Sequence, residues 1–221
     1  MKVLIIGNQN QVNEFELKFG NQNKYTVVDN TNIDPEILQD HDVVFDFMLD
    51  EEPDNLELYQ NFDGLPVFVN APKISMAEQI YINGKVNCTL FGFNGLPTFL
   101  NREILEVSLI DKNDAQTLSN ICRELGTEFI VVDDRVGMAT PRVICMIINE
   151  AYYTVQEGTA NKHDIDLGMK LGTNYPYGPF EWCEMIGIAN VYELLEAVYE
   201  DTKDERYKIC PLLKKEYLAA Y

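Results

Sequence analysis

Residues 4–11 read LIIGNQNQ, a short apolar run that leads into a glycine. An apolar strand followed by a glycine turn is how a dinucleotide-binding strand–helix unit begins. In such a unit two further glycines admit the pyrophosphate and let the helix pack against the strand. Here those positions hold Gln9 or Asn10 and Val12. The stretch therefore predicts the first strand and turn of this fold, with side chains where phosphates would lie.

The first part of the chain alternates apolar runs with helical patterns. Asp34 and Pro35 predict the start of a short helix. Asn113 with Gln116 forms a capping-box pattern for a later helix that ends at Gly126. We expect strands at residues 3–6, 25–28, 43–49, 66–69, 88–93, 104–110 and 129–132. Strands separated by helices predict a parallel or mixed sheet that is covered on both faces.

The pattern changes near residues 133–137 and becomes almost entirely helical. Residues 142–156 carry a wide apolar stripe at helical spacing. Three more helices follow, at residues 161–172, 179–187 and 190–201, the last opened by a capping-box pattern at Asn190 and Glu193. We therefore predict two domains: an α/β Rossmann-like domain over residues 1–135 and an all-α domain over residues 136–221.

Composition narrows the possible functions. The formal net charge of -19 repels polyphosphates, so we expect no nucleic-acid binding. No apolar run approaches the roughly 20 residues that cross a bilayer, so we expect no membrane span. The five cysteines are scattered without a CxxC pair, and the N-terminus has no leader-like segment. Both features favour a reducing, cytoplasmic location.

The helical part resembles the C-terminal domain of the 3-hydroxyacyl-CoA dehydrogenases. The resemblance rests on KHDIDLGMKLG at residues 162–172, YPYGPFE at 175–181, VYE at 198–200, DERY at 204–207 and PLLKK at 211–215. In that family this domain is a helical dimerisation module that also closes one side of the substrate cleft. The resemblance therefore implies a homodimer, formed through the helical domain, and an acyl-CoA ligand.

The YPYGPFE motif has a physical interpretation of its own. Pro176, Gly178 and Pro179 predict a tight turn with restricted backbone angles. Phe180 is suited to anchor that turn in the core, and Glu181 places a negative charge in the first turn of the next helix. We interpret the motif mainly as architecture.

The N-terminal part resembles the family's Rossmann domain in outline. Gly7, followed by Asn8, matches the first glycine of the nucleotide loop. Asp29 matches the acidic residue that holds an adenosine ribose, and Asn70 matches a position on the turn after the fourth strand. The resemblance implies NAD as cofactor, with these four residues at its site. Only a short helix fits between Asp29 and Asp42, so the domain is shorter than in the family.

The resemblance also implies a reaction. In that family a histidine takes a proton from the hydroxyl of a 3-hydroxyacyl thioester, a glutamate supports the histidine, and hydride passes to NAD. Alignment through FNGLP at residues 93–97 puts Glu106 at the glutamate and Phe91 at the histidine. The family asparagine falls on Pro141. Glu106 is thus the retained catalytic position, while a phenyl ring and a proline cannot exchange protons.

Two interpretations follow. A 3-hydroxyacyl-CoA dehydrogenase with impaired or altered acid–base chemistry is supported by the helical motifs together with Gly7, Asp29 and Glu106. A non-catalytic dimeric binding or scaffold protein derived from that family is supported by Phe91 and Pro141.

A third interpretation, weaker than these two, is a cation site in an acidic stretch. Its carboxylates are Asp42, Asp46, Asp50, Glu51 and Glu52. A solvated acidic face explains this stretch more simply, so we expect no metal site.

Overall fold

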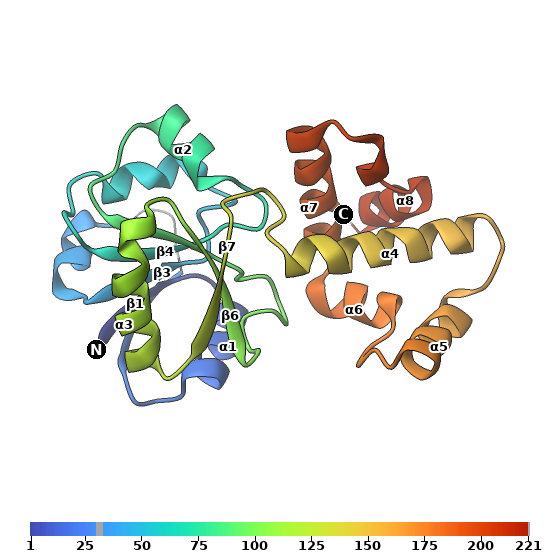
Figure 1. The fold of residues 1–221 in the computed structure, drawn as a ribbon, viewed down its shortest axis with the longest axis horizontal. Coiled ribbons are helices and arrows are strands. Elements are labelled where there is room, and N and C mark those ends of the chain that lie inside the picture. Colours follow the sequence, from blue (N-terminus) through green and yellow to red (C-terminus); the bar gives the residue numbers. More distant parts are fainter. Residues whose placement is uncertain (30–32, 221) are drawn as a thin grey trace. The chain divides into compact units, whose positions relative to one another are not determined.

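The computed structural model describes residues 1–29 and 33–220. The chain divides into two compact units, Met1–Met138 and Ala139–Tyr221 (Figure 1). The first unit is an α/β sheet structure and the second is all helical, which confirms the predicted fold class. Within the described residues, no helix is both long enough and apolar enough to cross a membrane.

A seven-stranded sheet forms the centre of the first unit. Its strands are β1 Lys2–Ile6, β2 Lys24–Val28, β3 Val43–Asp46, β4 Pro66–Asn70, β5 Thr89–Phe93, β6 Ile104–Leu109 and β7 Glu128–Val132. Their order across the sheet is β2-β1-β3-β4-β5-β6-β7. Neighbouring strands run parallel except β5 and β6, which are antiparallel. All seven predicted strands are confirmed, within a few residues at their ends.

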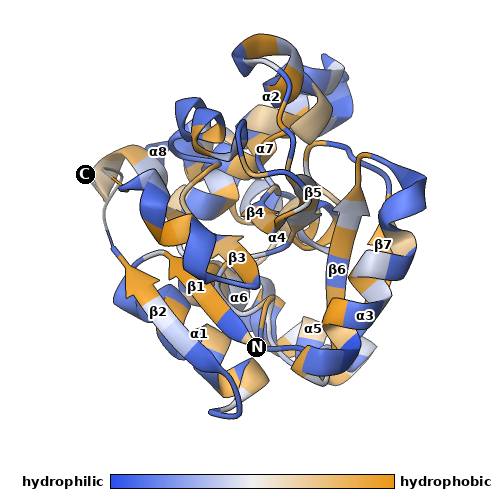
Figure 2. Cartoon of the chain, turned by 90° about the vertical axis from the view of Figure 1, so that its left-hand side faces the viewer, coloured by the Kyte–Doolittle hydropathy of each residue, from blue (hydrophilic) through white to orange (hydrophobic). Residues whose placement is uncertain are grey.

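Both faces of this sheet are buried. Val3 and Ile5 of β1 belong to an apolar cluster with side chains of α1 Gln9–Phe19 and α3 Ala115–Leu125. Leu4 and Ile6 belong to a second cluster, with residues of the 3-10 helices η1 Pro35–Asp40 and η2 Pro53–Tyr59 and of helix α2 Met76–Asn83. This double burial explains the continuous apolar runs of the strands. Figure 2 shows β1 and β3 as largely hydrophobic, whereas α3 alternates between hydrophobic and hydrophilic residues.

Some predicted boundaries are wrong. Strand β3 stops at Asp46, not at residue 49, because the Asp46 carboxylate accepts the Met48 amide at 2.8 Å and turns the chain. Helix α3 starts at Ala115 because Asp111 instead caps a preceding 3-10 turn, η3 Lys112–Asp114. The predicted cap at Asp34 is confirmed, since its side chain accepts the amide two residues on, at 3.0 Å.

The second unit consists of α4 Thr140–Gln156, α5 Lys162–Thr173, α6 Pro179–Ile186, α7 Ile188–Thr202, η4 Glu205–Tyr207 and α8 Pro211–Ala219. Helix α4 carries a buried stripe and packs with α6, α7 and α8. The predicted capping box at Asn190 is wrong, because α7 has already begun at Ile188. The Asn190 side chain instead donates to the carbonyl of Ile186 at 2.9 Å. Helix α8 was not anticipated.

The KHDIDLGMKLG and YPYGPFE motifs meet at the start of α6. Asp166 of α5 is buried and accepts the amides of Phe180 at 2.8 Å and Glu181 at 3.3 Å. A Cβ on Gly178 would lie 2.2 Å from this carboxylate, so only glycine fits there. Glu181 accepts the Gly178 amide at 2.9 Å and pairs with Lys170; this hydrogen bond from Lys170 is the main cause that lowers the pKa of Glu181.

We predict that Asp166→Ala lowers the free energy of unfolding by about 2 kcal/mol, because it leaves two amides at the start of α6 without their buried acceptor. Urea unfolding followed by Trp182 fluorescence measures this change. The matched control is Glu184→Ala, an exposed carboxylate on the same helix, which should shift stability by less than about 0.5 kcal/mol. Equal losses in the two variants would contradict the capping role.

Candidate functional site

The strand order changes direction where β1 lies between β2 and β3. Helix α1, which follows β1, packs on one face of the sheet, and η2, which follows β3, packs on the other. Open α/β sheets bind ligands in the crevice at the carboxyl ends of the strands, at such a switch point. The turns after β1 and β3 therefore form the candidate site.

The turn after β1 is held by a complete capping box. The side-chain oxygen of Asn8 accepts the amides of Asn10 at 3.0 Å and Gln11 at 3.2 Å. The Gln11 Oε1 atom accepts the Asn8 amide at 2.8 Å. Gln9 and Asn10, at the expected glycine positions, are exposed. The side chain that folds onto the turn beside Gly7 is Gln11, which the sequence analysis missed although the N-x-x-Q spacing is a capping-box pattern.

The other two predicted cofactor residues, Asp29 and Asn70, follow or end different strands and differ in burial. Asp29 is exposed and follows β2, directly beside the turn that contains Gly7, whose amide donates to Val28 at 2.9 Å. Asn70 ends β4, two strands away from β1, and is buried. Its Oδ1 atom accepts the Gly95 amide at 2.9 Å, so it ties the turn after β4 to the turn after β5.

One buried carboxylate, Asp46, and one half-buried carboxylate, Asp50, lie near the end of β3. Asp46 accepts the Tyr59 hydroxyl and the Met48 amide, both at 2.8 Å, and burial raises the pKa of Asp46 to about 6. Burial likewise raises the pKa of Asp50 to about 7, against the opposing effect of Lys73. The Oδ1 atom of Asp50 is buried and has no hydrogen-bond partner. The sequence alone indicates both residues only as possible cation ligands.

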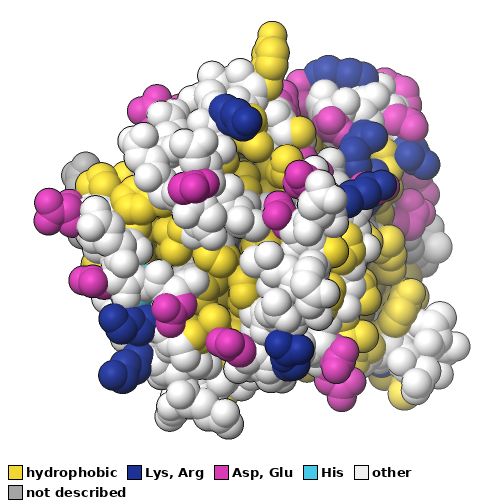
Figure 3. Space-filling view, turned by 60° about the vertical axis from the view of Figure 1, so that its left-hand side comes forward, with side chains coloured by type: hydrophobic (Ala, Val, Ile, Leu, Met, Phe, Trp, Pro, Cys, Tyr) yellow, Lys and Arg dark blue, Asp and Glu magenta, His cyan; other side chains and the backbone are white. Residues whose placement is uncertain are grey.

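The acidic residues of this stretch do not converge on one point. Asp42 lies at the opposite end of β3, where it accepts the Lys2 amide at 2.7 Å. Over residues 1–29 and 33–220, no group of three or more His, Cys, Asp or Glu side chains is placed to hold a metal ion. On one face of the molecule, acidic and basic side chains are scattered among apolar ones (Figure 3).

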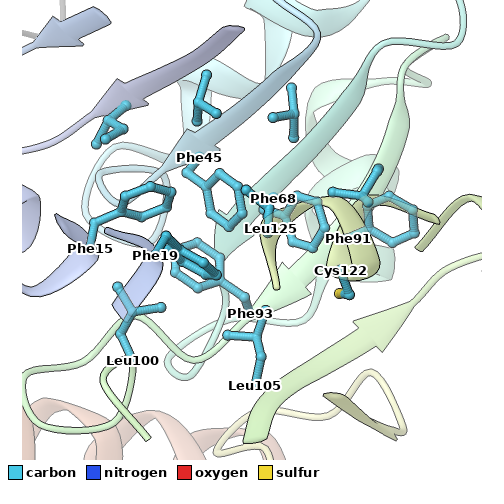
Figure 4. Close-up of a cluster of buried hydrophobic side chains, with 14 of the residues drawn as sticks. Phe15, Phe19, Phe45, Phe68, Phe91, Phe93, Leu100, Leu105, Cys122 and Leu125 are labelled. Carbon is cyan, nitrogen blue, oxygen red and sulfur yellow. The ribbon is translucent and has the colours of Figure 1, made fainter. Parts of the chain in front are cut away.

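Phe91, which the resemblance aligns with the family histidine, belongs to the apolar cluster that faces α1 and α3 (Figure 4). It is fully buried, and its ring centroid lies 4.8 Å from that of Phe68. Its environment is a set of phenyl rings that also includes Phe45 and Phe93.

Glu106 points to the other face of the sheet. Its neighbours on β6, Leu105 and Val107, belong to the same cluster as Phe91, and successive residues of a strand face opposite sides. Across the β5–β6 pair, Glu106 is matched with Asn94, whose amide donates to the Glu106 carbonyl at 3.2 Å. The sheet therefore lies between the side chains of Phe91 and Glu106.

Pro141 contributes to packing and Ser75 caps a helix; the chain has two histidines, His41 and His163. Pro141 is buried near the start of α4. His41 hydrogen-bonds through its ring nitrogens near the start of β3, and His163 is exposed on α5. Ser75 caps α2 and donates to the Asp134 carboxylate at 3.1 Å, while that carboxylate also accepts the first two amides of α2.

Comparison with known proteins identifies the helical unit. Residues 137–220 match the family model described as the C-terminal domain of 3-hydroxyacyl-CoA dehydrogenase. The helical unit, over residues 137–220, therefore belongs to this domain family. The chain is 40% identical over 96 residues to a 3-hydroxyadipyl-CoA dehydrogenase of Escherichia coli, covering 43% of this chain and 20% of that relative.

A probable 3-hydroxybutyryl-CoA dehydrogenase of Bacillus subtilis is 32% identical over 122 residues, which cover 55% of this chain and 42% of the relative. The chain thus matches less than half the length of these curated family members. A crystal structure of (S)-3-hydroxybutyryl-CoA dehydrogenase from Ralstonia eutropha aligns with a TM-score of 0.77 at 19% identity, over 100% of this chain and 94% of that one. At this identity, the likeness shows a shared fold of both units.

We predict that stability falls as pH rises from about 4 to 7, because folding raises the pKa values of Asp46 and Asp50. The folded state then binds more protons than the unfolded state in this window, so deprotonation favours unfolding. Asp50→Asn should remove part of this decline in the free energy of unfolding, and the part removed should be roughly 1–3 kcal/mol at pH 8. Urea unfolding followed by circular dichroism at several pH values measures it. Glu52→Gln, which removes an exposed charge two residues from Asp50, should leave the slope nearly unchanged; an equal effect would contradict the prediction.

Proposed function

We propose that this chain is a dimeric member of the 3-hydroxyacyl-CoA dehydrogenase family that does not perform the NAD-linked oxidation of 3-hydroxyacyl-CoA at a useful rate. The separation of Phe91 and Glu106 by the sheet carries this proposal. A general base must lie within hydrogen-bond reach of the proton it takes and of the group that supports it. Neither the residue type at position 91 nor its direction meets that requirement, and Pro141 adds no side-chain donor.

The proposed role is therefore that of a binding or scaffold protein, with an acyl-CoA as a candidate ligand. A relative with altered acid–base chemistry is the second candidate, and buried Glu106 is the observation that favours it, because this carboxylate is kept inside the sheet at a polar cross-strand pair with Asn94. The two candidates differ in one measurable property, the consumption of NADH.

We expect no NADH consumption when the purified chain is mixed with NADH and acetoacetyl-CoA. Phe91→His should not create activity, since its side chain would enter the apolar cluster, and it should lower the free energy of unfolding by about 3 kcal/mol. Absorbance of NADH and urea unfolding measure the two effects.

Two further variants decide the alternative. If the wild type consumes NADH, Glu106→Gln should abolish the reaction while Glu103→Gln, an exposed carboxylate just before β6, should not. That pattern would overturn the proposed loss of catalysis and support the altered enzyme.

The dimer is proposed from the family resemblance and from an exposed apolar row on α5. Leu167 is 44% exposed and Leu171 is 78% exposed, one turn apart. Gly168 and Gly172 lie beside them with open space where a Cβ would be. A helix surface of this kind lets a second copy approach the backbone closely and cover the two leucines.

We expect sedimentation to give a mass near twice the 25.3 kDa of one chain. Leu171→Glu should shift the protein toward monomer, because a carboxylate buried without a partner is costly. Leu17→Glu, at a 72% exposed leucine on α1, is the control and should leave the mass unchanged. A monomeric wild type, or a dimer that Leu171→Glu leaves intact, would contradict this placement of the interface.

A further inference from the structure

Five backbone amides in the turn before α1 and at its start donate hydrogen bonds within the chain. A helix N-terminus binds an anion through amides that lack an intrahelical partner. Here the amides of residues 7, 8, 10, 11 and 12 all donate within the chain, at 2.8–3.2 Å. Their acceptors are the carbonyls of Val28 and Asn8 and the side-chain oxygens of Asn8 and Gln11. The capping box therefore supplies the oxygen atoms that a phosphate would supply in a nucleotide loop.

The space beside Gly7 is filled as well. A Cβ built on Gly7 would lie 2.7 Å from Gln11 Oε1 and 3.2 Å from the Cβ of Phe47. The side-chain amide of Gln11 and the base of the Phe47 side chain thus pack directly against the one glycine that the loop retains. The second glycine of a nucleotide loop normally keeps this approach open for the pyrophosphate.

Phe47 extends this filling across the edge of the sheet. Its amide donates to the carbonyl of Ile6 at 2.8 Å, which sets the residue beside the end of β1. Its ring packs edge-on against Phe93 with 5.0 Å between centroids, and lies 2.9 Å from where a Cβ on Gly95 would be. Phe47 is 1% exposed. One phenyl ring therefore spans from the turn after β1 to the turn after β5, across the switch point.

We infer that Gln11 and Phe47 form an internal plug in the crevice where a Rossmann fold holds a dinucleotide. NAD, which the family resemblance implies, does not fit the residues as they are arranged here. Binding would require the capping box to open and a buried ring to move. This inference is independent of the proposed loss of catalysis, because nucleotide binding is measured without turnover.

The plug is tested by titrating NADH into the full chain and following nicotinamide fluorescence. The wild type should show no saturable binding below about 1 mM. Gln11→Gly, which removes the side-chain acceptor, should bind at least about tenfold more tightly, and adding Phe47→Ala should tighten binding further. Gln11→Glu is the matched control, because glutamate at this position still completes a capping box, and it should behave as the wild type does.

Two binding results would overturn the inference: saturation of the wild type below about 0.1 mM NADH, or a folded double variant that binds no more tightly than the wild type. If the variant with Phe47→Ala does not fold, amide hydrogen exchange of the wild type is compared with that of Gln11→Gly, and this comparison tests the inference. The Asn8 amide should be protected in the wild type and lose that protection in the variant. Rapid exchange at Asn8 in the wild type would equally overturn the plug. NADH turnover by the wild type, in contrast, bears on the proposed function.

Discussion

The requirement that a parallel sheet bury both of its faces governs the rest of this structure. Each inner strand sends alternate side chains into one of two apolar clusters, so the position of a residue along its strand decides which layer it joins. A shift of one residue moves a side chain to the opposite layer. The surroundings of Phe91 and Glu106 follow from this constraint alone: one side chain lies among phenyl rings, and the other lies on the far side of the sheet.

The fold was largely predictable from the sequence because it depends on this same periodicity. The seven apolar runs each became a strand, Asp34 caps a helix as expected, and Asn161 caps the helix that was predicted over residues 161–172. The errors lie where a polar side chain had two possible partners. Asp111 was available as a cap upstream of Asn113, and Asn190 bonds backward to Ile186. Sequence spacing shows that such a bond can form, but the path of the backbone decides which one does.

The candidate site was less predictable, for a related reason. Gly7 and Asp29 could be located because they end adjacent strands. The role of Phe47 depends on contacts between turns that are far apart in the sequence, such as its contact with Gly95. Periodicity carries no information about such contacts. The helical unit behaves in the opposite way: its motif residues Asp166, Gly178 and Glu181 contact one another within a short stretch, so a local pattern was enough to recognise them.

The uncharged cap between Asn8 and Gln11 has a consequence for how this unit responds to its surroundings. A protein whose loop waits for a cofactor is stabilised by mass action, and its melting temperature rises and falls with the supply of that cofactor. In a loop that is closed by its own amide side chains, those side chains take the place of the cofactor. They belong to the same chain, so their effective concentration is fixed. On the inference that Gln11 and Phe47 exclude the dinucleotide, the folded population of the sheet unit is set by the chain itself and does not follow the supply of that cofactor.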